Sequence, residues 1–281
     1  MTSDRASAYR SEDSPGREPE WPADPAPVLG AVREDIRQTL RTGWIDPALE
    51  AAEAFPVFFT AAWSAIRPNV GKSFLLLASR LRAQAVSSIR AATEPPDLRK
   101  RFERDLAEGE LRRVEECVRA AHLASAKVQI VVHAFYRAVR GDRIPGTGRE
   151  EAPIRRGIPE WQRWMSSQLT PDGNGRTPLR LLARWPNVMA SVRNELEPLW
   201  DSDKLKGGAI RLRRLLLAGV SSLPHPVELQ WVALKARGFS DDHRVRLSDV
   251  LRAHDASMAT QTLTAAFAWT AFGAPEIGAQ G

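Results

Sequence analysis

Cysteine and long apolar runs are nearly missing from this chain of 281 residues, in which Cys117 is the one thiol. A single cysteine cannot form an intrachain disulfide and does not suffice for a cysteine-based zinc site. No apolar stretch reaches the length that spans a membrane, and the amino terminus has no segment typical of a secretion signal. We therefore expect a cytoplasmic protein without a membrane partner.

Signatures of cofactor and metal sites are also lacking. The sequence has neither the G-x-G-x-x-G pattern of dinucleotide-binding loops nor the H-E-x-x-H pattern of zinc enzymes. Gly71-Lys72-Ser73 resembles the end of a phosphate-binding loop, but Ile66 stands where that loop requires glycine. The histidines are scattered along the chain: His122, His133, His225, His243 and His254. We expect no metal and no cofactor.

Basic residues outnumber acidic ones by 40 to 34, which gives a net charge of +6. Arg112-Arg113 and the arginines at 211, 213 and 214 are interleaved with leucines at helical spacing, so we interpret them as polar faces of amphipathic helices. Nucleic-acid binding rests on charge alone and is the last of our hypotheses. The hydrophobic fraction of 43% and the chain length suffice for one large domain or two coupled ones.

What the sequence does contain is an internal repeat. Phe55-Pro56 and Pro68 return 130 residues later as Trp185-Pro186 and Pro198. Because both members of the block move by the same offset, the spacing between them is preserved. Such preserved spacing is the first sign of a duplicated structural unit.

Two further blocks follow in the same order. Residues 86–89 (VSSI) return 134 positions later as residues 220–223 (VSSL), and residues 122–125 (HLAS) return 132 positions later as residues 254–257 (HDAS). Two copies of this size are typical of a duplicated half-domain rather than of a solenoid, which needs at least about three short repeats. We predict two tandem helical repeats of about 130 residues that form one pseudo-symmetric unit.

The hydrophobic periodicity is helical and no segment alternates as a strand does, so the predicted fold class is all-α. Helices of the first half are expected at residues 28–40, 47–54, 56–66, 72–91, 98–121 and 125–139. The predicted organisation is a disordered tail (1–27), a first helical repeat (28–141), a linker (142–160), a second helical repeat (161–273) and a tail (274–281).

Several motifs together resemble one enzyme family. They are residues 34–40, Trp44, Phe55-Pro56, Trp63 and Arg67-Pro68-Asn69 in the first half, and residues 182–186 and 223–226 in the second. Over residues 28–273 the chain is similar to the group I 2-haloacid dehalogenases, also filed as the halocarboxylic acid dehydrogenase family. The resemblance implies an all-helical pseudo-dimer with its active site at the interface of the repeats, assembled into a homodimer.

The reaction of that family is hydrolytic. An aspartate activates a water molecule, which displaces halide at C2 of a short 2-haloacid without an ester intermediate. The resemblance places the family's Ser-Asp pair on Thr177-Pro178, and a proline cannot serve as the base. Thr177 keeps a hydroxyl, and Arg176 beside it joins the predicted substrate-binding residues. We expect a divergent member that lacks the usual base.

Other predicted substrate-binding residues come from the first half. The resemblance keeps the family's aromatic pocket residue at Trp44, followed closely by Pro47. An asparagine that the family uses is missing, which leaves His122 and Ser125 as the polar groups in its place. His122 and His254 occupy equivalent positions, so either they begin helices near a serine cap or they line a cavity between the repeats.

Asp46 is the candidate for a relocated catalytic base, because its helix break corresponds to the break that holds the usual base. Asp172, in the glycine-rich stretch of the second half, is a weaker candidate. The alternative for Asp46 is an N-cap that binds the first N–H groups of the helix begun by Pro47. The functional hypotheses are a 2-haloacid dehalogenase with a relocated base, and a non-catalytic helical module that binds a small carboxylate or a protein partner.

Overall fold

The computed structural model describes residues 26–151, 157 and 179–273, and within them the chain is all-α, as predicted. Extended pairing in these ranges is limited to an isolated antiparallel bridge between Ile144 and Val227. No helix in the described part of the chain is long and apolar enough to cross a membrane. The helices are α1 (Ala26–Leu40), α2 (Pro47–Glu53), α3 (Pro56–Ile66), η1 (Arg67–Asn69), α4 (Lys72–Ala92), α5 (Leu98–Phe102), α6 (Glu108–Arg140), η2 (Leu179–Leu182), α8 (Pro186–Leu196), η3 (Glu197–Leu199), α9 (Asp203–Val220), α10 (Trp231–Ala236) and α11 (Asp241–Ala271).

The two halves use helices of the same kind in the same order. α3 and α8 each have 11 residues, begin at a proline and continue into a 3-10 helix of 3 residues. The residues before them, Phe55 and Trp185, have almost the same backbone angles, with φ −123° and ψ 71° in one and φ −117° and ψ 78° in the other. Proline suits the first helical position because its fixed φ matches the helix and its missing N–H has no partner there in any case.

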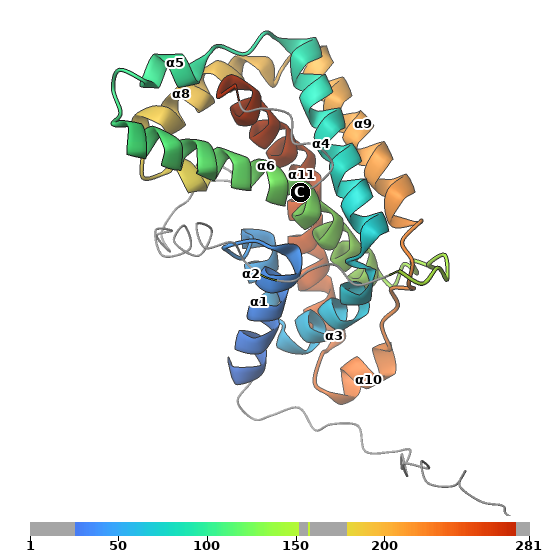
Figure 1. Ribbon diagram of the computed structural model, residues 1–281. Helices are drawn as coiled ribbons and strands as arrows, with labels where there is room; N and C mark the ends of the chain where they lie inside the picture. Colours follow the sequence, from blue (N-terminus) through green and yellow to red (C-terminus); the bar gives the residue numbers. More distant parts are fainter. Residues whose placement is uncertain (1–25, 152–156, 158–178, 274–281) are drawn as a thin grey trace, which may run out of the picture.

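The long helices correspond as well. α4 has 21 residues and α9 has 18, while α6 has 33 and α11 has 31. α6 packs along α11 and α4 along α9, so each long helix lies beside its counterpart (Figure 1). This arrangement is compatible with the predicted tandem repeat, whose boundaries at 28–141 and 161–273 stay a prediction.

Close contact between α4 and α9 depends on two glycines of α9. A Cβ atom at Gly219 would lie 2.2 Å from Cδ1 of Leu77, and one at Gly208 would lie 2.8 Å from Cβ of Ser88. A Cβ at either position would force Leu77 or Ser88 to move, so glycine allows the two helices to approach as they do.

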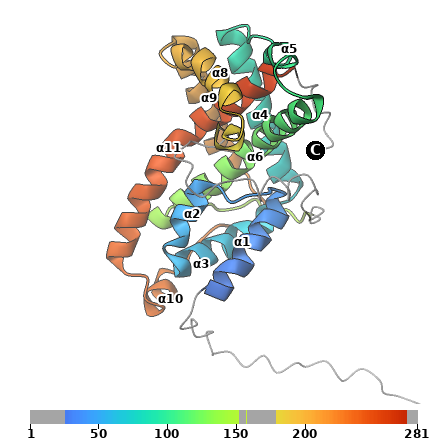
Figure 2. The same ribbon diagram turned by 90° about the vertical axis from the view of Figure 1, so that its left-hand side faces the viewer.

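The halves interlock at both ends of the α6–α11 pair (Figure 2). At one end α5 of the first half lies near α8 of the second, and Arg101 and Glu195 form an ion pair there at 3.0 Å. At the other end Phe239, which follows α10, packs its ring against Phe55 and Phe58 of the first half, with centroids 6.3 and 5.6 Å apart. Burying a phenylalanine side chain stabilises a fold by roughly 1.5–3 kcal/mol, so these cross-contacts join the halves into one unit.

The predicted helix boundary between residues 121 and 125 is wrong. α6 runs without interruption through His122 and Ser125, and residues 98–102 form the separate short helix α5. Ser125 Oγ donates a hydrogen bond to the carbonyl of His122 at 3.3 Å, and Ser257 does the same to His254 at 2.9 Å inside α11. A serine hydroxyl can be satisfied by bonding back within its own helix, so these serines do not act as caps.

Gly71-Lys72-Ser73 has a structural role at the start of α4. Glu151 binds there, accepting a hydrogen bond from the Ser73 backbone N–H at 2.8 Å and a second one from the Ser73 hydroxyl. A carboxylate is stabilised at a helix amino terminus by the free N–H groups and the helix dipole. A Cβ at Gly71 would lie 2.7 Å from Oε2 of Glu151, so a larger residue there would displace this carboxylate.

Candidate functional site

A cavity of about 350 Å³ lies where α4 and α6 of the first half meet α11 of the second. α4 contributes residues spaced by three and four positions, which share one side of a helix. The described lining residues are Ser79, Arg82, Ala83, Val86, Ser87 and Arg90 from α4, His122 from α6 and Trp269 from α11. This set contains two arginines and no acidic residue, so its charge is suited to an anion.

His122 forms the inner wall of the cavity. Its ring stacks on Trp269, with centroids 5.2 Å apart and planes 7° from parallel. The side chain is buried, and its Nδ1 atom has no hydrogen-bond partner in the part of the chain that the structure describes. Burial, and secondly the charge of Arg82, lower the pKa of His122 to about 3. The imidazole is therefore neutral at physiological pH, with one N–H to donate and one lone pair to accept.

Arg82 supplies the positive charge next to this imidazole. Burial lowers the pKa of its guanidinium, so the group is partly withdrawn from water. It makes none of the ion pairs found among the described residues. A guanidinium on a cavity wall without a carboxylate neighbour is well placed to bind an anionic ligand, because its planar fork matches a carboxylate.

Lys127 of α6 is a second buried cation near Arg82. Its side chain is 7% exposed, and Nζ donates a hydrogen bond to the carbonyl of Leu40 at 2.9 Å. Burial lowers the pKa of Lys127 to about 7, and the charges of Arg82 and Arg41 contribute to the shift. The charge of Arg82 lowers the pKa of both His122, in the cavity, and Lys127, at the carboxyl end of α1.

The break between α1 and α2 places Trp44, Asp46 and Pro47 together. Trp44 and Asp46 are buried, and the Trp44 Nε1 group has no hydrogen-bond partner within the described residues. Asp46 Oδ1 accepts a hydrogen bond from the Ala48 N–H at 3.0 Å, and Pro47 begins α2. The carboxylate of Asp46 thus caps a helix, which is the structural alternative to its predicted catalytic role.

The predicted site residues are therefore only partly brought together. His122 lines the cavity, Ser125 lies one turn further along α6, and Trp44, Asp46 and Pro47 form the break after α1. Arg176, Thr177 and Pro178, and also Asp172, lie outside the described residues. The assignment of a common substrate site to all of them stays a prediction.

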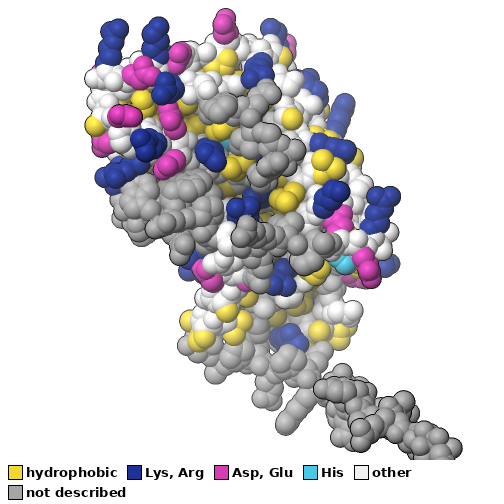
Figure 3. All heavy atoms as spheres, in the orientation of Figure 1, with side chains coloured by type: hydrophobic (Ala, Val, Ile, Leu, Met, Phe, Trp, Pro, Cys, Tyr) yellow, Lys and Arg dark blue, Asp and Glu magenta, His cyan; other side chains and the backbone are white. Residues whose placement is uncertain are grey.

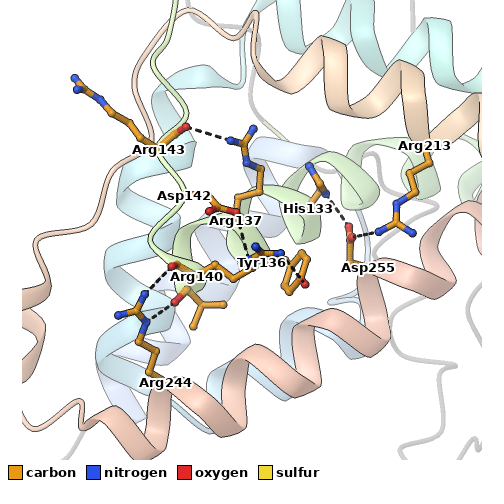
Figure 4. A network of polar contacts seen from close by, with 10 residues as sticks. His133, Tyr136, Arg137, Arg140, Asp142, Arg143, Arg213, Arg244 and Asp255 are labelled. Carbon is orange, nitrogen blue, oxygen red and sulfur yellow. Dashed lines mark hydrogen bonds and ion pairs between the residues drawn. The ribbon is translucent and has the colours of Figure 1, made fainter.

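A second polar cluster lies further along the long helices, between the cavity and the start of α11 (Figure 4). His133 Nδ1 of α6 lies 2.9 Å from Asp255 Oδ1 of α11, and both side chains are buried. Arg213 of α9 approaches the other carboxylate oxygen at 3.9 Å. His133 Nε2 is buried and has no partner among the residues that the structure describes. The cluster connects three helices, and none of its residues lines the cavity of about 350 Å³.

Sequence reasoning missed Arg82 and Lys127. The chain has 40 basic residues, and many helical arginines are expected on polar outer faces. Nothing in the spacing of Arg82 distinguishes it from them. A signal existed for Lys127, because the position 132 residues later is Ala259 and the surrounding stretch of α6 is apolar. A lysine at a position where the equivalent residue is a buried alanine indicates a role other than packing.

Metal and thiol chemistry find no support in the structure. Among the described residues no group of three or more His, Cys, Asp and Glu side chains could hold a metal ion. Burial raises the pKa of the Cys117 thiol to about 12, so it stays protonated. On the face shown in Figure 3, lysine and arginine side chains are dispersed rather than gathered in one band, so this face gives no support to nucleic-acid binding.

Comparison with solved structures identifies the fold. The chain resembles a D-2-haloacid dehalogenase mutant in complex with D-2-CPA, with a TM-score of 0.76 and 15% sequence identity over 87% of this chain and 92% of the other. It resembles the D-2-haloacid dehalogenase complex with L-LA equally well, with a TM-score of 0.76 and 16% identity over the same shares. No protein-family model and no curated protein matches the sequence. The fold is thus haloacid dehalogenase-like, and the low identity shows the fold alone.

Proposed function

We propose that this protein binds a short carboxylate of the 2-haloacid type in the cavity beside His122, and that it hydrolyses such acids slowly or not at all. The observation that carries the proposal is the charge of the cavity. Arg82 has no acidic neighbour among the described lining residues, and its field already disfavours protonation of His122 and Lys127. A bound carboxylate would relieve this repulsion.

The lining suggests how such a ligand would lie. Its carboxylate would bind the guanidinium of Arg82, where charge-assisted hydrogen bonds are strongest. Its apolar end would contact the ring of Trp269 and the methyl groups of Ala83 and Val86. The neutral imidazole of His122, whose Nδ1 atom is otherwise unpaired, would bind the substituent at C2.

Slow turnover follows from the missing base. Hydrolytic displacement needs a group that takes a proton from water while the oxygen attacks C2 and the halide leaves. The described lining offers only His122, whose low pKa makes it a weak base. The resemblance places proline at the family's base, and Asp46 is engaged in capping α2. We assign any remaining activity to Asp46.

The solved structures with a similar fold support the proposed class of ligand, a short carboxylate. The similar solved structures are D-2-haloacid dehalogenases with the ligands D-2-CPA and L-LA. We carry over from them the class of ligand, and from the sequence resemblance the status of a divergent group I member and homodimer. Location in the cytoplasm is part of the same proposal.

Calorimetric titration with L-lactate and racemic 2-chloropropionate, together with a halide-release assay, tests the function. We expect both acids to bind, and Arg82→Met to weaken binding by about tenfold or more, because a charged hydrogen bond contributes about 1.5–3 kcal/mol. Arg112→Met is the matched control, since Arg112 is exposed on the surface of α6. Absence of binding by the wild-type protein would refute the proposal, and rapid halide release would refute the claim of slow turnover.

A further inference from the structure

We infer that Arg41, Arg82 and Lys127 form a buried anion subsite at the carboxyl end of α1, and that a carboxylate enters it together with a proton taken up by Lys127. This inference rests on the proposed binding of a carboxylate in the adjoining cavity. It concerns residues that neither the sequence resemblance nor the helix break assigns to the site.

The first argument is the arrangement of charge. Lys127 is held against the end of α1 by its hydrogen bond to the Leu40 carbonyl. The charged side chains of the described residues that act on it are Arg82 of α4 and Arg41, the residue after α1, and both are cations. Three cations near one buried point repel one another unless an anion lies among them.

The second argument is a pair of unsatisfied polar groups. Thr39 and Trp44 stand on either side of Leu40 in the sequence, and both side chains are buried. Thr39 Oγ1 and Trp44 Nε1 have no hydrogen-bond partner in the described part of the chain. Buried donors are rarely left unpaired, so these two groups near the end of α1 are available to an acceptor that the described residues do not supply.

The third observation is the turn that ends α1. Arg41 has φ 56°, the left-handed conformation common for the residue after a helix, and the Thr42 N–H closes the turn by donating to the Arg37 carbonyl at 3.0 Å. This turn holds Arg41, whose charge acts on Lys127, next to the Leu40 carbonyl that Lys127 binds.

The coupling to a proton follows from the position of Lys127. With its pKa lowered to about 7, Lys127 is increasingly neutral above that pH. An anion beside the amine favours the charged form and raises the pKa, so binding above pH 7 draws in a proton. Below pH 7 the amine is already charged and binding needs no proton. The affinity therefore falls as the pH rises above 7, by up to about tenfold per pH unit.

The test is calorimetric titration with L-lactate, which has no halide to lose. At pH 8, the observed heat in buffers of different ionisation enthalpy gives the number of protons taken up on binding. We expect uptake of a substantial fraction of one proton by the wild-type protein at pH 8 and almost none at pH 6. Lys127→Met should abolish the uptake and flatten the pH dependence. Lys235→Met, which removes an exposed lysine paired with Asp241, should change neither.

The outcomes separate this inference from the proposed function. Binding without proton uptake at pH 8, or uptake that persists in Lys127→Met, would overturn the subsite and leave carboxylate binding intact. Failure of the wild-type protein to bind L-lactate or 2-chloropropionate at pH 6 would overturn both. If Lys127→Met does not fold, the wild-type profile decides, because an affinity that is constant from pH 6 to 8.5 contradicts the inference.

Discussion

Two stretches of the α6–α11 pair have different surroundings: one at His122 and Trp269, here called the open end, and one at His133 and Asp255 midway along α11, here called the closed end. Along these antiparallel helices the contacts follow one another as His122 with Trp269, Gln129 with Thr262, and His133 with Asp255. The first contact borders a cavity whose lining residue Arg82 makes no ion pair among the described residues. The last belongs to a filled cluster in which a carboxylate faces a histidine and an arginine. The same pair of helices thus borders a cavity in one stretch and a filled polar cluster in the other.

Sequence positions related by the predicted repeat carry different side chains in the two stretches. At the offset of 134 residues Ser79 corresponds to Arg213, and Arg82 corresponds to Leu216. The short serine leaves space in the cavity, whereas Arg213 extends to Asp255. At the second end the cation therefore has its own counter-charge and needs no ligand. At the first end Arg82 makes no ion pair with a described residue, which is why we place the ligand there.

The largest effect is expected when the arginine of the closed end, Arg213, is placed at the corresponding position of the open end. Ser79→Arg should fill the cavity with a long side chain and add a third cation, and L-lactate binding should fall below detection. Calorimetric titration measures this. Ser221→Arg is the control, because it makes the same change at an exposed residue after α9. Binding that survives in Ser79→Arg would show that the ligand lies elsewhere.

Asp255→Ala should open the closed end at a cost in stability. It leaves His133 buried without its partner, and breaking a buried polar pair costs about 2–4 kcal/mol in the free energy of unfolding. Chemical denaturation measures the loss. Asp249→Ala removes an exposed aspartate of the same helix and should change stability by less than about 0.5 kcal/mol. Equal losses in both variants would contradict a structural role for the cluster.

Lys127→Met tests the cost of keeping a cation at the open end. The pKa of Lys127 in the folded state is below that of a free lysine, so the unfolded chain binds the proton more tightly. Below the pKa of the unfolded state this difference lowers the free energy of unfolding of the wild-type protein. Removing the amine should raise the free energy of unfolding by about 1–3 kcal/mol near pH 6. The gain should shrink as the pH rises from 7 towards 10, because the folded amine is already neutral there and the proton that the unfolded amine still binds becomes less favourable as the pH approaches its ordinary pKa of 10.5. Denaturation at both pH values measures it, and a gain independent of pH would refute this account.

The sequence was sufficient for the fold class and for most helices. Pro56 and Pro186 begin α3 and α8. A proline acts on its own backbone, so its effect can be predicted from the sequence alone. The continuity of α6 through His122 was not predictable in this way. Its serine can cap a helix or bond back inside one, and tertiary packing against α11 decides between the two.

Site residues were predictable only where they match the family's motifs or have a counterpart in the internal repeat. His122 was found because it has a counterpart at His254. Arg82 and Lys127 were missed because their importance comes from neighbours 40 or more positions away in sequence, such as Leu40 for Lys127. Charge clusters of this kind form when helices pack, and helical spacing alone does not show them.

The smallest expected signal concerns the base. Asp46→Asn should change the free energy of unfolding by less than about 0.5 kcal/mol, because asparagine caps a helix as well as aspartate does. Halide release from racemic 2-chloropropionate, slow in the wild-type protein, should fall to background in this variant if Asp46 accepts the proton from water. Robust wild-type turnover that Asp46→Asn leaves unchanged would refute the relocated base. Pro178→Asp completes the set, since it restores a carboxylate where the resemblance places the family's base. Suppose that Pro178→Asp gains halide release and Asp46→Asn does not change it. The natural chain would then bind a 2-haloacid without hydrolysing it, and the open end would be a binding site only.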